Sequence, residues 1–420
     1  MNKNMFLILL FLFVTEGLFG QNIYKYDSLE PEIIDGRAEA LGTTSILSSS
    51  GANYVFNNPA MLSSLESIDL QFNIRTQLGK TKTSSSMSDT IYYDTVRSYT
   101  DFTRTFHYKI NGLAFCIPYK MSENSNWKFG FAAGYRTYYD WGYNLNQKGK
   151  SFGIPSIEEE ESDYNGGFNT LVLGSGISYK KKIFGGLSIS LPFLSEYSEI
   201  FENYDGSEAK NSGTLKGTFL TLSGSYILNS YLKLGARYRT KYILENEYDN
   251  FLNVHHKNKY TIPAEYGFAL EVKPHTNIKI FTEYITCKFS DYKDVYFIHS
   301  ETKDGYSFRT GIELGSRYLL RCGFLRQCVP VYKLIPHYNE ITNVHCPKIE
   351  KKPQVETGFT AGFGSHIQTR IQLSLYCVYS FLKYKESFAL YSPGFINYGD
   401  ITNDFSYYLF KIGCSLGYSF

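Results

Sequence analysis

The sequence has few of the features that mark soluble enzymes or helical membrane proteins. Beyond the first 20 residues, no apolar run approaches the length of about 20 residues that a membrane-spanning helix needs. Only 43% of the 420 residues are hydrophobic, so a large aliphatic core is not expected. Neither charge sign dominates, because 42 Lys and Arg stand against 40 Asp and Glu. This balance argues against a basic surface that binds nucleic acid.

Patterns typical of metal or catalytic sites are also missing. The seven Cys are odd in number, and most lie in apolar alternations as small hydrophobic residues. Cys328 and Cys346 flank a predicted loop, and the sequence leaves open whether they form a disulfide. The eight His lack zinc-site spacing, and no nucleophile elbow, phosphate-binding loop or dinucleotide fingerprint is convincing. We therefore expect no enzymatic activity, no metal and no cofactor.

The N-terminus has the layout of an export signal. Lys3 precedes an apolar run from residue 5 to residue 14, and small residues follow at Gly17 and Gly20. A basic start, a short apolar run and a small residue before the cleavage point are typical of a secretory signal peptide. We expect residues 1–20 to be this signal peptide.

The dominant pattern in the rest of the chain is an alternation of apolar and polar residues with period two. At the C-terminus, Phe410, Ile412 and Cys414 alternate with Lys411 and Gly413. Such alternation predicts strands with one apolar face, and no helical periodicity of comparable length is present. Fourteen strands are predicted, at 68–78, 104–117, 127–141, 167–179, 183–194, 214–228, 231–243, 262–272, 278–289, 305–315, 318–328, 355–364, 367–383 and 405–420.

The connections and the last residue favour a membrane barrel over a secreted propeller or sandwich. Short turns are predicted at 180–182, 229–230 and 316–317, and long polar loops at 79–103, 142–166, 195–213, 244–261, 329–354 and 384–404. Short turns at one end and long loops at the other are typical of outer-membrane barrels. The strand that ends in Phe420 resembles the recognition signal of Gram-negative outer-membrane proteins. The predicted fold is an all-β, 14-stranded antiparallel transmembrane β-barrel over residues 67–420.

Charged residues of the predicted strands share the face opposite the lipid. Those read as facing the lumen are Asp69, Arg75, Arg136, Arg237, Arg239, Glu265, Arg309, Glu313, Arg321, Glu356 and Arg370. We expect Arg309, Glu313 and Arg321, on two neighbouring strands, to form an interior ladder of ion pairs. Pairing that fills the barrel is favoured over ligand binding for any single one of these charges.

Residues 21–66 do not alternate and contain two short motifs of small residues. The first is Gly36-Arg37-Ala38, and the second contains Asn58-Pro59-Ala60 and Leu62. With weaker motifs downstream, they resemble the FadL/TodX family of outer-membrane transporters for long-chain fatty acids and other hydrophobic compounds. The resemblance implies that residues 21–66 form an N-terminal hatch that plugs the 14-stranded barrel.

The resemblance also implies a passive transport route. A hydrophobic molecule would enter from the outer loops, reach a site beside the hatch and leave sideways through the barrel wall. Gly130 and Gly134 lie on the predicted inner face of the third strand, and a glycine within a strand often marks a bulge or a close approach. Two interpretations stay open: a lateral opening near these glycines, or simply room for the hatch.

A second possible function, binding of proteins instead of small molecules, stays open. Barrels similar to PorV share the fold and the Asn-Pro-Ala step, and act as protein-binding shuttles in type IX secretion. The predicted loops are mostly polar, which favours the transporter. The partners expected for it are a hydrophobic small molecule, membrane lipids and lipopolysaccharide, the barrel assembly machinery through Phe420, and no nucleic acid. We expect a monomer in the Gram-negative outer membrane with both termini in the periplasm.

Overall fold

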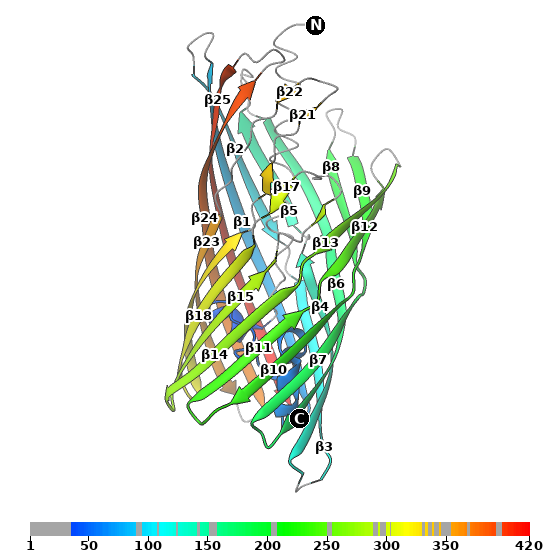
Figure 1. Cartoon of the computed structure of the whole chain (residues 1–420), viewed down its shortest axis with the longest axis vertical. Coiled ribbons are helices and arrows are strands. Elements are labelled where there is room, and N and C mark those ends of the chain that lie inside the picture. The colour runs from blue at the N-terminus through cyan, green and yellow to red at the C-terminus, as the bar shows by residue number, and fades with distance from the viewer. Residues whose placement is uncertain are drawn as a thin grey trace.

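The computed structural model of the chain is a tall barrel whose strands tilt around a closed wall (Figure 1). The structure describes residues 35–420 except 90–94, 107–108, 123–124, 141–142, 151–157, 203–207, 250–253, 289–292, 295–299, 303, 330–331, 335–337, 340–343, 346–353, 368–369 and 392–396. The predicted signal peptide and Cys346 lie outside the described residues.

The barrel has 14 antiparallel strands, which confirms the predicted fold class. Several are described in two consecutive pieces. The pieces in chain order are β1 (Asp69–Asp89), β2 (Thr95–Phe106) with β3 (Lys109–Lys120), β4 (Trp127–Asp140) with β5 (Tyr143–Lys150), β6 (Glu158–Tyr179), β7 (Ile183–Pro192) with β8 (Glu196–Glu202), β9 (Glu208–Lys216) with β10 (Phe219–Ile227), β11 (Leu232–Arg239) with β12 (Tyr242–Asp249), β13 (His255–Ile262) with β14 (Glu265–His275), β15 (Ile278–Cys287) with β16 (Lys293–Asp294), β18 (Gly305–Gly315), β19 (Tyr318–Val329), β23 (Gln354–Ile367), β24 (Ile371–Tyr391) and β25 (Asn397–Ser419).

Two small sheets accompany the barrel. The first pairs β17 (Ser300–Thr302) with β20 (Tyr332–Leu334), and the second pairs β21 (Tyr338–Asn339) with β22 (Val344–His345).

The last strand closes the barrel on the first. β25 pairs with β1 in a continuous antiparallel ladder from Asp69 opposite Ser419 to Asp89 opposite Gly399. The backbone N–H of Phe420 donates to the carbonyl oxygen of Ile68 at 2.9 Å, which extends the pairing to the end of the chain. Closure leaves the wall without a free edge, so backbone polar groups along these two strands are paired within the protein.

The wall is polar on the inside and apolar on the outside. On β1, Asp69, Asn73 and Arg75 are buried in the lumen, whereas Leu78 on the other face is exposed. On β25, Phe410 and other outward side chains are exposed, and Ser415 is buried. Large apolar side chains exposed all around a barrel form the surface that a membrane barrel presents to lipid. None of the helices within the described residues is long and apolar enough to cross a membrane.

The predicted long loops are largely wrong, because the strands continue through most of them. β1 runs to Asp89 and β2 begins at Thr95, and β24 runs to Tyr391 while β25 begins at Asn397. The predicted loops at 142–166, 195–213 and 244–261 likewise contain β5, the start of β6, β8, β9, β12 and β13. The extension of β1 over residues 80–89 consists mostly of Lys, Ser and Thr, so the sequence has no hydrophobic alternation there. Backbone hydrogen bonds between neighbouring strands hold these extensions without it.

Residues 35–65, called the inner segment here, lie inside the barrel near its turn end (Figure 1). They form α3 (Gly36–Ala40), η2 (Gly51–Asn53), α4 (Tyr54–Asn57) and η3 (Pro59–Ser64). Asp35 caps α3 by accepting hydrogen bonds from the N–H groups of Arg37 and Ala38, and Pro59 stands at the first position of η3, where no N–H is needed. α3 contacts β19, β23, β24 and β25, and η3 contacts β3, β4, β6, β7 and β10. The inner segment therefore touches walls on opposite sides.

Candidate functional site

Glycines of the wall let the backbone of the inner segment approach very closely. A Cβ added at any of these positions would overlap with backbone atoms of the inner segment. The glycines and the residues they face are Gly130 with Leu62, Gly176 with Pro59, Gly186 with Ala60, Gly311 with Leu41 and Gly323 with Gly42. Gly42 itself has φ +74°, a left-handed conformation that favours glycine. The inner segment is thus seated against the wall over a wide arc.

Hydrogen bonds from the wall fix the same segment. Glu283 accepts from the backbone N–H groups of Ser45 (2.8 Å) and Ile46 (2.7 Å), and Asp69 accepts from that of Ala52 (2.7 Å). On the other side, the N–H of Ala60 donates to the hydroxyl oxygen of Ser223 at 2.9 Å. Buried donors of the segment are therefore satisfied by wall side chains.

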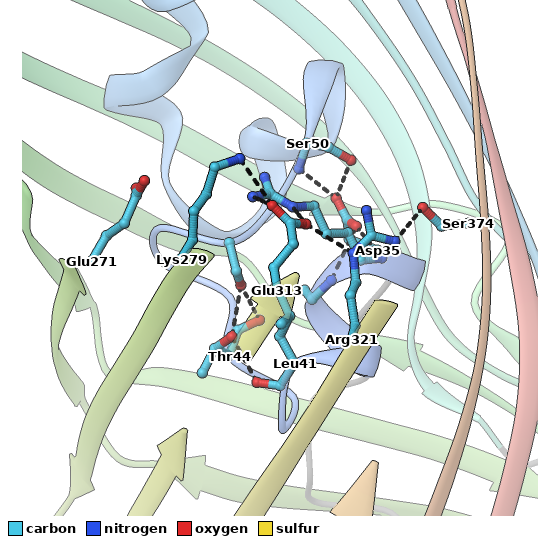
Figure 2. A network of polar contacts seen from close by, with 12 residues as sticks. Asp35, Leu41, Thr44, Ser50, Glu271, Lys279, Glu313, Arg321 and Ser374 are labelled. Carbon is cyan, nitrogen blue, oxygen red and sulfur yellow. Dashed lines mark hydrogen bonds and ion pairs between the residues drawn. The ribbon is translucent and has the colours of Figure 1, made fainter. Parts of the chain in front are cut away.

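An ion-pair network, which we call the latch, joins the inner segment to β15, β18 and β19. Arg37 donates two hydrogen bonds to Glu313, from Nε at 2.8 Å and Nη2 at 2.9 Å. Glu313 also accepts from Arg321 Nε and from Lys279 Nζ, each at 2.9 Å. Figure 2 shows Glu313 between Lys279 and Arg321, with Asp35 and Ser50 close by. The carboxylate of Glu313, which is 2% exposed, therefore has three cationic partners.

A second group of buried charges, called the arginine cluster, lies further along the wall. It consists of Arg136 on β4 and of Arg237 and Arg239 on β11, packed against Tyr138, Tyr139, Phe168, Phe219 and Tyr242. Arg237 and Arg239 both donate to Glu265, the latter at 3.1 Å. The guanidinium carbons of Arg136 and Arg239 lie 4.4 Å and 5.4 Å from the ring centre of Tyr138. One tyrosine ring is thus shared by two guanidinium groups.

Two bulges shape the wall at this cluster. Tyr138 is the extra residue where β4 pairs with β6, and it is buried together with Tyr139. Asn111 is the extra residue where β3 pairs with β1, beside Gly112, which is the register partner of Arg136. A bulge breaks the strict alternation of a strand and redirects a side chain. Two consecutive tyrosines can therefore both be buried, and Asn111 is buried as well.

Several buried side chains of this region have unsatisfied polar atoms among the residues that the structure describes, Nε of Arg237 and Nε of Arg239 included, and three of these side chains are neighbours on β3, β4 and β6. Arg136 is 1% exposed, and its Nε, Nη1 and Nη2 have no hydrogen-bond partner. Both amide atoms of Asn111 and the hydroxyl of Thr170 are likewise buried and unpaired. Thr170 is the register partner of Arg136 on β6. These orphaned groups therefore come from neighbouring positions on three adjacent strands.

The structure places the predicted motif residues of 21–66 in contact with the wall. Gly36 begins α3, Arg37 belongs to the latch, and Ala38 is buried. The other motif residues form and support η3: Asn58 donates from Nδ2 to the carbonyl of Ile46 at 2.6 Å, Pro59 and Ala60 start the turn, and Leu62 is buried.

The predicted ladder of lumen charges is found in two separate parts. Glu313 and Arg321 are register partners and bond directly. Arg309 instead donates to the carbonyl of Thr43 at 3.0 Å and lies 3.9 Å from Glu283. The sequence could not separate these two, because a second inward carboxylate on a neighbouring strand, Glu283, competes for Arg309.

Gly130 and Gly134 face the inner segment. A Cβ at Gly134 would lie 2.7 Å from the ring of Phe56, and Gly130 faces the carbonyl of Leu62. Both glycines are paired with β3 on one side and β6 on the other. Among the described residues, the ladder between β3 and β4 has its last pair at Gly112 and Arg136, two positions beyond Gly134. This pair adjoins the arginine cluster, to which Arg136 belongs.

Comparison with known proteins bears on the fold. No family model and no curated protein match the sequence. Among solved structures, a Pseudomonas aeruginosa FadL homologue is covered over its whole length by 94% of this chain, with a TM-score of 0.59 at 10% identity. The P. putida toluene transporter TodX matches over 93% of this chain and 99% of its own, with a TM-score of 0.52 at 14% identity. The chain has their fold. The architecture implied by the FadL/TodX resemblance is thereby confirmed.

Metal chemistry finds no support in the side-chain arrangement. Across the part of the chain that the structure describes, no group of three or more His, Cys, Asp and Glu side chains could hold a metal ion. The site consists of a seated inner segment and, beyond it, aromatic rings around guanidinium groups.

Proposed function

We propose that this protein is a passive outer-membrane channel for hydrophobic small molecules, with long-chain fatty acids among its substrates. The observation that carries the proposal is an inner segment seated in a barrel of the FadL and TodX fold, with a buried aromatic cluster directly beyond it. A wide aqueous pore would need an open lumen, whereas a plugged one suits molecules that move between apolar surfaces.

In this proposal residues 21–66, which include the inner segment, form the hatch, and residues 67–420 form the barrel around it. The backbone of the inner segment touches glycines of the wall on several strands, and its Arg37 donates two hydrogen bonds to Glu313 of the wall. Withdrawing it would break all of these contacts together. A route that leaves it in place is therefore favoured, and we place the exit in the wall.

The lateral exit that we propose lies next to Gly134, where the ladder between β3 and β4 has its last pair among the described residues. A disulfide between the two strands just beyond that pair tests it: Asn111→Cys with Thr137→Cys, in a variant whose native cysteines are alanine, is expected to block uptake until it is reduced. The matched control is Leu113→Cys with Tyr135→Cys, which joins register partners within the same two strands. Equal uptake with the first pair oxidised or reduced would contradict the exit.

The remaining features of the proposal concern export and assembly. Residues 1–20 direct export, Phe420 is read by the barrel assembly machinery, and the monomer contacts membrane lipid and lipopolysaccharide with both termini in the periplasm. Phe420 supports this role, because it is 61% exposed at the end of β25.

Uptake and bound molecules test the function. In a Gram-negative host without its own transporter of this kind, expression should raise the uptake of radiolabelled dodecanoate above that of the empty host. Mild extraction followed by mass spectrometry should find hydrophobic small molecules bound to the protein. Unchanged uptake by folded protein, together with a stoichiometric secreted protein in pull-downs, would favour the shuttle that resembles PorV.

A further inference from the structure

The charges of the arginine cluster do not balance. Arg136, Arg237 and Arg239 are all at least 94% buried, and Glu265 is the one carboxylate bonded to any of them in the described structure. Three positive charges and one negative charge leave a net charge of +2 inside the wall. Burying a charge without a counter-charge is strongly unfavourable, so such groups are normally paired.

Arg136 carries the larger part of this imbalance. Arg237 and Arg239 share Glu265, whereas three nitrogens of Arg136 have no acceptor among the residues that the structure describes. Its guanidinium group lies over Tyr138 at 4.4 Å and near Phe56 at 5.4 Å. Cation–π contacts compensate part of the lost hydration, but they use the faces of the group and leave its N–H edge unused.

The neighbours of Arg136 supply further polar atoms of the same kind. Asn111 and Thr170 stand at adjacent register positions on the two flanking strands, and both are buried with unpaired polar atoms. The fork of a guanidinium matches the two oxygens of a carboxylate, and an amide and a hydroxyl can each add a donor. The missing partner is therefore an anionic acceptor with at least two oxygens.

The surroundings define the rest of the ligand. The rings of Phe168, Phe219 and Tyr242 are buried beside those of Tyr138 and Tyr139. The hydroxyl groups of Tyr139 and Tyr242 bond to each other at 3.0 Å. Such a lining favours an apolar body with few polar groups.

We propose that Arg136 binds the carboxylate of a hydrophobic acid, with Asn111 and Thr170 as auxiliary donors, and thereby makes the channel prefer acids over neutral hydrocarbons. This assignment rests on the proposed transport function and adds the residue that selects among its substrates. The bulges at Asn111 and Tyr138 lie next to Arg136 in the wall and in the neighbouring strand.

Two probes of equal chain length test the assignment. Binding of radiolabelled dodecanoate and of 1-dodecanol to the full protein in neutral detergent is measured by equilibrium dialysis at a pH where the acid is ionised. Wild-type protein should bind dodecanoate at least about tenfold more tightly. Arg136→Met should lose about tenfold or more in dodecanoate affinity, the effect of removing hydrogen bonds to a charged group. Its affinity for dodecanol should stay within about twofold of wild type.

Two further variants control for charge and folding. Arg136→Lys keeps the charge without the fork and should fall between wild type and Arg136→Met. Arg326→Met removes an exposed arginine from the outer face and should change neither affinity. An undiminished preference for dodecanoate in Arg136→Met, or equal losses for both probes, would overturn the assignment and leave the channel function standing. Wild-type protein that binds neither probe would contradict both.

Discussion

The latch and the arginine cluster use the same residue types in opposite states. In the latch, Glu313 is shared by Arg37, Arg321 and Lys279, and the network joins the inner segment to the wall. In the arginine cluster, Arg136 is as deeply buried but has no acceptor among the described residues. The difference separates a structural charge from the charge that we propose binds a ligand: within the described residues, Glu313 has its partners and Arg136 has none.

Removing the carboxylate of the latch should have the largest effect on stability. Glu313→Ala leaves three cations without their shared partner, and breaking a buried pair in this way costs about 3–5 kcal/mol. Denaturant unfolding in detergent measures the change. A loss below about 1 kcal/mol would mean that the latch does not hold the inner segment.

Removing the carboxylate of the arginine cluster should be less costly and reversible by ligand. Glu265→Gln removes the negative charge that Arg237 and Arg239 share and replaces one acceptor oxygen by an amide donor, with an expected loss of about 3 kcal/mol, the low end of the range for such pairs. Dodecanoate should then raise the midpoint of thermal unfolding by more than it does in wild type, because it replaces the lost charge. An equal or smaller rise would show that the acid does not bind among these arginines.

Removing one cation of the latch should cost less again. Arg37→Met should destabilise the protein by about 2 kcal/mol, because Glu313 keeps Arg321 and Lys279. Dodecanoate affinity should not change, since Arg37 belongs to the latch and not to the cluster. A matching loss of affinity would show that the two regions act as one.

The smallest effect is expected for an exposed ion pair outside both regions. Glu66 bonds Lys181 at 3.0 Å and Lys128 at 3.3 Å, and its side chain is 71% exposed. Exposed pairs contribute between 0 and about 1 kcal/mol, so Glu66→Gln should change the free energy of unfolding by less than that. A larger loss would indicate that charge in general, and not burial, decides the contributions of the latch.

The alternation of residues made the barrel predictable, including its strand number and its inward charges. Arg136, Arg237 and Glu265 were all read as facing the lumen from the sequence, because one-sided burial requires a strict period of two. The same rule failed wherever burial was not one-sided. It missed the extensions of β1, β24 and β25, and it could not foresee that Tyr138 and Tyr139 are both buried at a bulge.

Partners of the charges could not be read from the sequence. Arg309 and Arg321 look alike in their strands, yet one lies near Glu283 and the other bonds Glu313. The seating of the inner segment was also hidden, because Gly176, Gly186, Gly311 and Gly323 look like ordinary strand glycines until the backbone opposite them is known.

The stability of Arg136→Met without ligand is the most direct test of the distinction between paired and unpaired charge. If Arg136 is an unpaired cation kept for a ligand, its replacement by an apolar side chain of similar length should raise the free energy of unfolding by about 2 kcal/mol. Dodecanoate should then stabilise wild-type protein and not the variant. A fall of similar size in the ligand-free variant would show that Arg136 is a structural charge like Arg37, and would contradict its role in ligand binding.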